Sequence, residues 1–192
     1  MMRIEKGNPG YLKAQRKIEV IKTVIAFALV IAVFLAGYLT TKTRLNVLTV
    51  VAVLGCLPAC KILVGVITRW PYHSIEETTA AEIEASTTHL TVAYDMVITS
   101  ESKIMPIDSI VIYGNTICGY THSDKVDLNY AAKHIKKILE QNHFEGLTVK
   151  LFDKYKAFIT RAEGLESIAV VENHESRERE EQMKAVILCI SL

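Results

Sequence analysis

Two long apolar segments near the start of the chain restrict its fold more than any other feature. Residues 23–41 carry no charge, and residues 45–68 are interrupted only by Lys61. At 1.5 Å per residue, a helix over the first segment is about 28 Å long, close to the roughly 30 Å hydrocarbon core of a bilayer. Neither segment has the polar face that a helix of a small soluble protein presents to water. The sequence therefore predicts a transmembrane helical hairpin.

The flanks of these segments predict how the hairpin is oriented. Residues 1–22 contain six basic side chains, whereas the connection between the two helices contains only Lys42 and Arg44. Four side chains at the far end of the second helix have the character of interfacial anchors: Lys61, Arg69, Trp70 and Tyr72. The positive-inside rule places both termini in the cytoplasm, with residues 1–22 as a basic cytoplasmic tail. The alternative for the first segment, a cleaved signal peptide, lacks a suitable cleavage site.

Small residues recur at every fourth position of both predicted membrane helices. They are Ala28, Ala32 and Ala36 on the first helix and Ala52, Cys56 and Cys60 on the second. Small side chains let two backbones approach closely, which is how helices associate in lipid. We expect these stripes to face each other or a second copy of the chain. Metal binding or lipidation at the cysteines is the alternative, and a metal is disfavoured because no histidine or acidic residue lies nearby.

Charge separates the chain into two parts. The net charge of +1 conceals ten basic against two acidic residues in residues 1–72, and twelve against nineteen in residues 73–192. The second part therefore carries a net charge of −7. Nucleic-acid binding requires a basic surface that neutralises phosphates. We expect the partners to be the membrane and a second copy or another membrane protein, and not a nucleic acid.

Residues 73–192 have the pattern of one α+β domain on the cytoplasmic side. Amphipathic periodicity predicts helices at residues 75–86, 127–143, 153–161 and 176–190. Alternating or compact β-branched runs predict strands at residues 89–99, 107–113, 116–121, 147–152 and 168–172. The predicted domain thus begins with the order α-β-β-β-α-β.

Two motifs in the predicted strands carry a family resemblance. Residues 106–112 read Pro-Ile-Asp-Ser-Ile-Val-Ile, and residues 115–120 read Asn-Thr-Ile-Cys-Gly-Tyr. The stretch of residues 94–152, about a third of the chain, resembles the nuclease-related domain of the restriction-endonuclease-like superfamily. The resemblance implies an α-β-β-β-α-β core with Asp on one strand and Glu-x-Lys on the next. In that family the carboxylates hold a divalent cation while the lysine stabilises the attacking hydroxide or the phosphate.

The sequence departs from the family where the chemistry takes place. Asp108 stands at the aspartate position, but Cys118 occupies the position of the glutamate and Tyr120 that of the lysine. A neutral thiol is a poor ligand for a hard cation such as Mg²⁺. We therefore expect a degenerate site without a cofactor, in which Asp108 has a structural role. The predicted function is a membrane-anchored, non-catalytic interaction or assembly module.

Two other functions stay open at this point. The first is a membrane-tethered nuclease that uses Mg²⁺ or Mn²⁺ in a rearranged site of Asp95, Glu101, Lys103 and Asp108. The second is an accessory subunit of a larger membrane complex. Glu101 and Lys103 spell Glu-x-Lys in a turn, where a charged hairpin loop is the simpler explanation. Asp95 is expected to be buried on a strand and hydrogen-bonded.

The remaining polar and thiol residues predict structural roles. His122, Asp124 and Asp127 fall in one loop, where a cap at the following helix is favoured over a metal site. Cys118 and Cys189 are expected to be free, buried thiols in a reducing cytoplasm.

Overall fold

A computed structural model describes the chain except for residues 1–3, 43–46 and 173–176. It contains two compact units, which we treat separately. Leu12–Pro71 form a helical hairpin, and Met1–Tyr11 join Tyr72–Leu192 in a second unit, called here the domain. Two apolar helices and an α+β domain are therefore present, as the sequence predicts.

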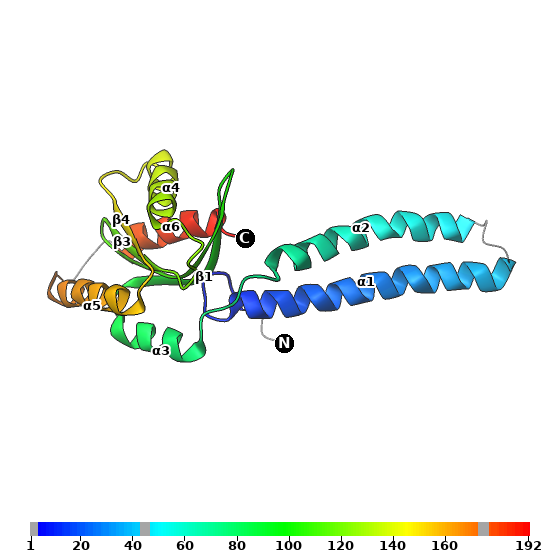
Figure 1. Ribbon diagram of the computed structural model, residues 1–192, viewed down its shortest axis with the longest axis horizontal. Helices are drawn as coiled ribbons and strands as arrows, with labels where there is room; N and C mark the ends of the chain where they lie inside the picture. The colour runs from blue at the N-terminus through cyan, green and yellow to red at the C-terminus, as the bar shows by residue number, and fades with distance from the viewer. Residues whose placement is uncertain (1–3, 43–46, 173–176) are drawn as a thin grey trace. The chain divides into compact units, whose positions relative to one another are not determined.

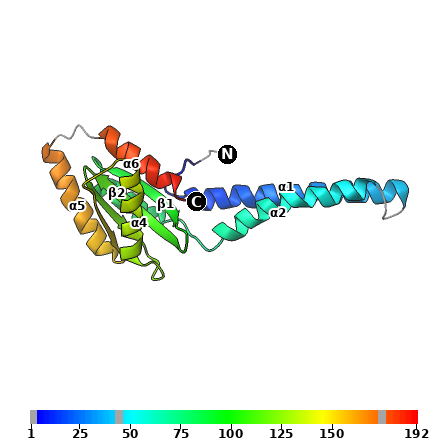
Figure 2. The ribbon, with the colours of Figure 1, turned by 90° about the horizontal axis from the view of Figure 1, so that it is seen from above.

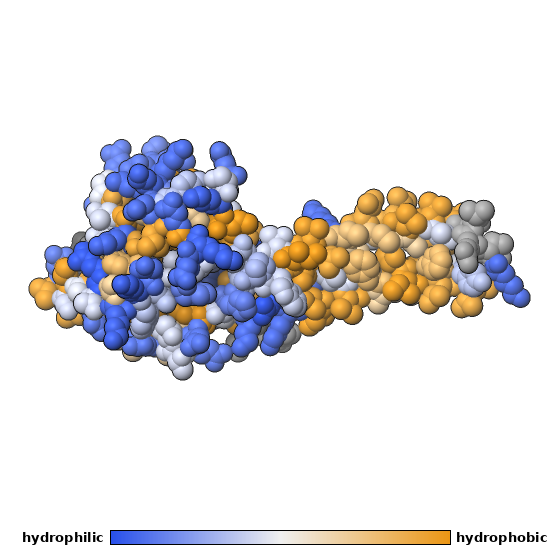
Figure 3. Space-filling view, viewed as in Figure 1, coloured by the Kyte–Doolittle hydropathy of each residue, from blue (hydrophilic) through white to orange (hydrophobic). Residues whose placement is uncertain are grey.

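The hairpin consists of α1 (Tyr11–Thr41) and α2 (Val47–Arg69) (Figure 1). Both helices are long and apolar enough to cross a membrane, with mean hydropathies of 2.5 and 2.4 in their most apolar stretches. Only 6% and 17% of these stretches are buried, so neither is the covered core helix of a soluble protein. Figure 3 shows the resulting hydrophobic surface along the hairpin. Helix α1 begins twelve residues earlier than the predicted span, inside the expected basic tail.

The contact between the two helices follows a seven-residue spacing. The buried residues of α2 are Ala52, Ala59 and Val66. At Gly55, a Cβ atom would lie 3.3 Å from Val30 Cγ2 on α1, so the missing side chain permits a close approach. Seven residues correspond to nearly two full turns, which keeps such residues on one side of the helix.

The small residues spaced by four positions follow a different path. Ala52 is buried and Cys56 partly so, whereas four others are exposed: Ala28, Ala32, Ala36 and Cys60. Each step of four residues overshoots a full turn by about 40°, so such a stripe rotates away from a straight contact. The exposed alanines of α1 are therefore not covered by α2. That they face a second copy of the chain stays a prediction.

Polar contacts join α1 and α2 near the C-terminal end of α2. Glu19 Oε1 lies 2.7 Å from Arg69 Nη1, and the two side chains are only 12% and 23% exposed. The Arg16 guanidinium lies over the Trp70 ring, 5.5 Å from its centroid, and donates a hydrogen bond to the Trp70 carbonyl at 3.4 Å. Two residues expected as interfacial anchors, Arg69 and Trp70, thus also hold the two helices together.

The domain contains four helices and a four-stranded sheet within its described residues. The helices are α3 (Glu77–Ser86), α4 (Leu128–Gln141), α5 (Tyr155–Glu172) and α6 (Arg177–Cys189). The strands are β1 (Thr91–Thr99), β2 (Ile104–Tyr113), β3 (Thr116–Tyr120) and β4 (Thr148–Phe152). They pair in sequence order, antiparallel from β1 to β3 and parallel between β3 and β4. Helix α4 makes the crossover that a parallel pair requires.

Helices cover both faces of the sheet (Figures 1 and 2). Helices α4 and α6 lie on one side, which we call the α4/α6 face, and α3 and α5 lie on the other, the α3/α5 face. The α4/α6 face is packed with aliphatic residues, among them Ile110, Ile112, Ile117, Ile135, Leu139 and Ile187. The α3/α5 face combines aliphatic and aromatic residues, among them Ile83, Tyr94, Val111, Cys118, Phe158 and Leu165.

Segments from both ends of the chain cover the free edge of β1. The Tyr94 amide donates to the Gly7 carbonyl at 2.8 Å. The Leu192 amide donates to the Val97 carbonyl at 2.9 Å, and the Val97 amide donates to Ser191 Oγ at the same distance. An uncovered edge would offer unpaired amides and carbonyls to other chains. The described residues before α1 thus belong to the same compact unit as the sheet.

Two predictions for the last third of the chain are wrong. The strand expected at residues 168–172 is the final part of α5, whose buried residues have helical spacing: Phe158, Ala162, Leu165 and Ala169. The β-branched residues that suggest a strand, Val170 and Val171, are 59% and 82% exposed on this helix. Cys189 is exposed, not buried, although it is a free thiol as expected.

Candidate functional site

A distortion of β1 and β2 places two carboxylates opposite each other. The ladder pairs flanking this point are Tyr94 with Ser109 and Met96 with Ile107. Asp95 and Asp108 lie between these pairs in directly opposed positions. Asp95 has a φ of +54°, a left-handed conformation that aspartate tolerates better than most residues. The backbone at Asp95 thus departs from the regular strand conformation at this point.

On both strands, the alternation of side chains between the two faces of the sheet shifts by one residue at this point, next to Asp95 on β1 and Asp108 on β2. The β2 residues in the core of the α4/α6 face are Met105, Ile107, Ile110 and Ile112. The corresponding β1 residues are Ala93, Met96 and Ile98. Asp108 and Ser109 therefore both turn toward the α3/α5 face, as do Tyr94 and Asp95. Because the slip affects both strands equally, the register between them is preserved.

Asp95 has the buried, hydrogen-bonded position that the sequence predicts. Asp95 is 2% exposed, and its Oδ1 accepts a hydrogen bond from the Ile75 amide at 2.9 Å. Ile75 lies in the segment that leads into α3. The Asp95 carboxylate therefore attaches this segment to the α3/α5 face of the sheet.

Asp108 forms a close pair with His122, which follows β3. Asp108 Oδ2 accepts a hydrogen bond from the His122 amide at 2.7 Å, and the imidazole Nδ1 lies 2.8 and 2.7 Å from Oδ1 and Oδ2. The Asp108 side chain is 5% exposed, whereas that of His122 is 57% exposed. The contact with Nδ1 turns Nε2 away from the pair. Asp108 thus fixes the orientation of the His122 ring.

A cavity of about 370 Å³ lies beside this pair. Its walls come from the segment that leads into α3, from β2 and from the end of β3. The lining residues are His73, Ser74, Ile75, Glu76, Thr79, Asp108, Tyr120 and His122. Seven of the eight lining side chains, all except Ile75, carry polar atoms. The cavity walls therefore combine polar and apolar surface, in contrast to the aliphatic packing on the α4/α6 face.

Aromatic side chains pack around Tyr120, which lines the cavity. Tyr120 packs edge-on against Tyr155, with 5.5 Å between ring centroids, and lies 5.8 Å from Phe158. Burial, and then the Asp108 carboxylate, raise the pKa of Tyr120, so its hydroxyl remains protonated at neutral pH. The Tyr94 hydroxyl and Ser109 Oγ are buried without a hydrogen-bond partner. Buried polar atoms of this kind reduce stability.

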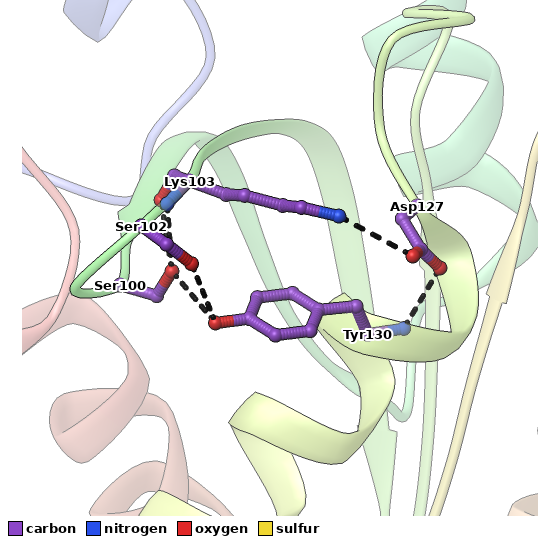
Figure 4. A network of polar contacts seen from close by, with 5 residues as sticks. All are labelled: Ser100, Ser102, Lys103, Asp127 and Tyr130. Carbon is purple, nitrogen blue, oxygen red and sulfur yellow. Dashed lines mark hydrogen bonds and ion pairs between the residues drawn. The ribbon is translucent and has the colours of Figure 1, made fainter.

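Glu101 and Lys103 lie far from Asp95 and Asp108. They are in the connection between β1 and β2, and five strand positions separate Lys103 from Asp108, about 16 Å along the chain. Lys103 Nζ lies 3.4 Å from Asp127 Oδ2 and 4.8 Å from the centroid of the Tyr130 ring (Figure 4). The Tyr130 hydroxyl bonds Ser100 and Ser102 in the same turn, so this network attaches the hairpin to α4. The four residues of the rearranged nuclease site are not brought together.

The two positions that replace the family's glutamate and lysine have different surroundings. Cys118 is 1% exposed in the core of the α3/α5 face, and burial raises the pKa of its thiol. It pairs with Val111 across the ladder and does not line the cavity. Tyr120 lines the cavity together with Asp108. Cys118 is thus a core residue, and Tyr120 belongs to the candidate site.

The loop before α4 holds a helix cap. Asp127 is the N-cap of α4, and its side chain accepts a hydrogen bond from the Tyr130 amide at 3.0 Å, which lowers the pKa of Asp127. The cap predicted from the sequence is confirmed. Within residues 4–42, 47–172 and 177–192, no group of three His, Cys, Asp or Glu side chains is placed to hold a metal ion.

The central pair of the site has no signature in the sequence. His122 falls in a loop with Asp124 and Asp127, whereas Asp108 lies in the motif that resembles a degenerate nuclease, so no local pattern connects the two residues. The only available signal is that a histidine follows β3 shortly after its end, next to a strand that carries an aspartate. Comparisons with protein-family models, curated proteins and solved structures found no match for this chain.

Proposed function

We propose that this protein is a membrane-anchored, non-catalytic interaction or assembly module whose cytoplasmic domain is a degenerate nuclease-like fold. The observation that carries the proposal is the pairing of Asp108 with His122. A nuclease of the resembled family needs this carboxylate for a cation, but here both its oxygens lie within hydrogen-bond distance of His122. The order α3-β1-β2-β3-α4-β4 supports the resemblance at the level of element order.

The membrane anchor is supported by how the chain enters and leaves the hairpin. Residues before α1 and residues after α2 belong to one compact unit, and the Gly7 carbonyl bonds the Tyr94 amide. Both flanks of the hairpin must therefore lie on the same side of a membrane that it crosses. The basic residues of the N-terminal region favour the cytoplasmic side. We propose a multi-pass membrane protein with both termini in the cytoplasm.

Self-association through α1 forms a separate part of the proposal. Ala28, Ala32 and Ala36 are exposed on α1. Small residues at this spacing allow close helix packing in lipid. Light scattering of the detergent-solubilised protein should give a mass above one chain, and Ala32→Leu should shift it toward the monomer. A strict monomer for the unchanged protein contradicts self-association, and crosslinking in native membranes then distinguishes a different membrane protein as the neighbour.

A nuclease assay tests the non-catalytic part of the proposal. Full-length protein in detergent is incubated with single- and double-stranded DNA and RNA, with Mg²⁺ or with Mn²⁺. We expect no cleavage above that of an Asp108→Ala variant purified in parallel. Metal-dependent cleavage that Asp108→Ala abolishes, while Glu101→Ala or Lys103→Ala weakens it, would overturn the proposal in favour of a membrane-tethered nuclease.

A further inference from the structure

The side of α5 that points away from the sheet has an exposed apolar end. Ile168, Val170 and Val171 are 43%, 59% and 82% exposed. Hydrophobic surface is visible at this end of the domain in Figure 3. Single exposed aliphatic residues are common, but three within four positions form a continuous patch, which is typical of a surface that contacts another molecule.

The patch continues along α5 as an uncharged face. Exposed residues without charge recur along the helix with alternating steps of three and four positions. They are Ala157, Thr160, Gly164, Ser167 and Val171. Such a spacing keeps side chains on one side of a helix and is the repeat with which two helices pack along each other. The face therefore has the geometry of a helix–helix contact.

Gly164 lies in the middle of this face. A glycine inside a helix is destabilising relative to alanine. A Cβ atom at Gly164 would meet nothing within 4 Å, so no contact in the described part of the chain requires a glycine here. The absence of a side chain allows another backbone to come close. Gly164 thus marks the point where a second helix can approach α5 most closely.

The charges of α5 are arranged against its own dipole. Its two basic residues, Lys156 and Arg161, come before its three acidic residues, Glu163, Glu166 and Glu172. The dipole of a helix favours acidic side chains near the N-terminus and basic ones near the C-terminus. The order in α5 is the reverse, so the helix by itself does not account for it.

An antiparallel second copy of α5 complements this order of charges. With Gly164 at the crossing, Lys156 of one copy is level with Glu172 of the other. The acidic end of one helix then lies beside the positive N-terminal end of the other, which the dipoles also favour. The Tyr113 hydroxyl donates to Glu172 at 2.8 Å and holds this carboxylate at its place on the helix. A parallel pair would instead place like charges side by side.

We propose that two copies of the domain associate through α5, with the two helices antiparallel and closest at Gly164. The same surface patch meets itself in such a contact, as a two-fold symmetric dimer requires. The inference rests on the proposed role of the domain as an assembly module and names its partner, a second copy of this chain.

Disulfide crosslinking of the full-length protein in membranes tests this arrangement. Two copies with different tags are coexpressed with Cys56, Cys60 and Cys189 changed to serine, while the buried Cys118 is kept. One copy carries Ala157→Cys and the other Val171→Cys. These positions are about 21 Å apart along one helix, beyond the reach of a disulfide, but level with each other in the antiparallel pair. We expect mild oxidation to join the two different copies.

The same variants expressed singly provide the control for orientation. When both tagged copies carry Ala157→Cys, or both carry Val171→Cys, the crosslinked fraction should be lower by about fivefold or more, because the antiparallel pair separates identical positions. Efficient crosslinking of each variant with itself indicates a parallel contact and contradicts the inference.

Gly164→Leu tests the close approach in the crosslinking pair. It should lower the crosslinked fraction by about fivefold or more, because a large side chain holds the two helices apart. Hydrogen exchange of the β2 amides should stay unchanged, since the space beside Gly164 is open within the domain. Lys137→Leu on α4 adds the same side chain at another exposed position and should leave the crosslinking unchanged.

Lys156→Glu separates a role between copies from a role within the helix. It agrees with the dipole of α5, so the amides of this helix should exchange more slowly. It also places an acidic residue level with Glu172 of the second copy, so crosslinking should fall by about two- to fivefold. A residue that acts only within the domain would not produce these two opposite changes.

Two further outcomes overturn the inference. If the Ala157→Cys and Val171→Cys copies crosslink no more than the single variants, α5 has another occupant, such as the membrane surface or a different protein. If Gly164→Leu and Lys156→Glu leave the crosslinking unchanged, the contact lies elsewhere. Either result leaves self-association through α1 intact when light scattering still gives a mass above one chain, and metal-dependent nuclease cleavage contradicts the proposed function independently of α5.

Discussion

The α4/α6 face of the domain is packed mainly with aliphatic side chains and buries one carboxylate, that of Glu180, which accepts hydrogen bonds from the Thr91 hydroxyl and the Gly114 amide. The α3/α5 face buries two carboxylates, a serine and a tyrosine hydroxyl, and it holds an open cavity. The side chains of both faces come from the same strands, so neighbouring residues of β2 pack on opposite faces of the sheet. Ile107 and Ile110 fill the first face, while Asp108 and Ser109 between them turn to the second. Burying polar atoms costs stability unless they are paired. The α4/α6 face thus hydrogen-bonds its buried carboxylate within the core, whereas the α3/α5 face leaves the Tyr94 hydroxyl and Ser109 Oγ unpaired.

Truncation of the aliphatic face should have the largest effect on stability. Ile135 on α4 is fully buried, so Ile135→Ala should lower the free energy of unfolding by about 2–5 kcal/mol through the lost burial and the cavity that remains. Hydrogen exchange of the β2 amides measures this in the full-length protein, because these amides report on the domain alone. Thr79→Ala at the cavity is the comparison and should cost far less. Equal costs for the two variants would remove the distinction between the faces.

Added volume on the same face should also destabilise the domain, by a smaller amount. A Cβ at Gly119 on β3 would lie 2.5 Å from Leu151 Cδ2 and 3.2 Å from Ile110 Cγ1. We expect Gly119→Ala to cost about 1–3 kcal/mol, measured in the same way, because such overpacking forces neighbours to move. Leu151→Val in the same background should recover part of the loss. If the single variant proves neutral, the packing here is looser than the contacts indicate.

Removal of a polar atom from the α3/α5 face should instead increase the stability of the domain. Ser109 is fully buried and its Oγ has no hydrogen-bond partner. Ser109→Ala should therefore raise the free energy of unfolding by up to about 1 kcal/mol, since the desolvation cost of the hydroxyl disappears. Ser191→Ala is the matched control, because its Oγ accepts from the Val97 amide and the variant should destabilise the domain. A loss of stability in both variants would show that Ser109 has a structural partner.

The smallest effect is expected at the turn between β1 and β2. Lys103 and Asp127 are about half exposed, and their 3.4 Å contact is open to solvent, where ion pairs contribute little. Lys103→Ala should leave the exchange of central β2 amides unchanged and accelerate only the amides of the turn. A change throughout the sheet would mean that the network of Figure 4 supports the fold and not merely the turn.

The features that the sequence predicts correctly are those that depend on residues close together in the chain. The two apolar helices, the first three strands and α4 have periodic patterns that do not depend on distant contacts, and Asp127 stands next to the helix that it caps. The strand predicted at residues 168–172 is wrong because β-branched residues also occur on exposed positions of a helix. There the buried spacing of Leu165 and Ala169 decides the structure.

The features that the sequence conceals depend on pairs that are distant in the chain. Asp108 and His122 are separated by a turn and a strand, and Glu19 and Arg69 by the entire hairpin. Their contacts depend on strand register and on helix packing, which a short stretch of sequence does not reveal. The same reason applies to Asp95, since its burial is predictable but its position opposite Asp108 follows from the ladder between β1 and β2.

The covered edge of β1 has a consequence for the order of events during synthesis. Gly7 leaves the ribosome 87 residues before Tyr94, and both apolar helices are translated between them. In our proposed topology, the N-terminal segment must therefore stay on the cytoplasmic side. It cannot pair with β1 until that strand has been synthesised. The segment with Leu192 is synthesised later still, so the Gly7 segment is the first of the two that can cover this edge. A bulky fusion placed at the N-terminus would obstruct this late step while leaving insertion of the helices unaffected.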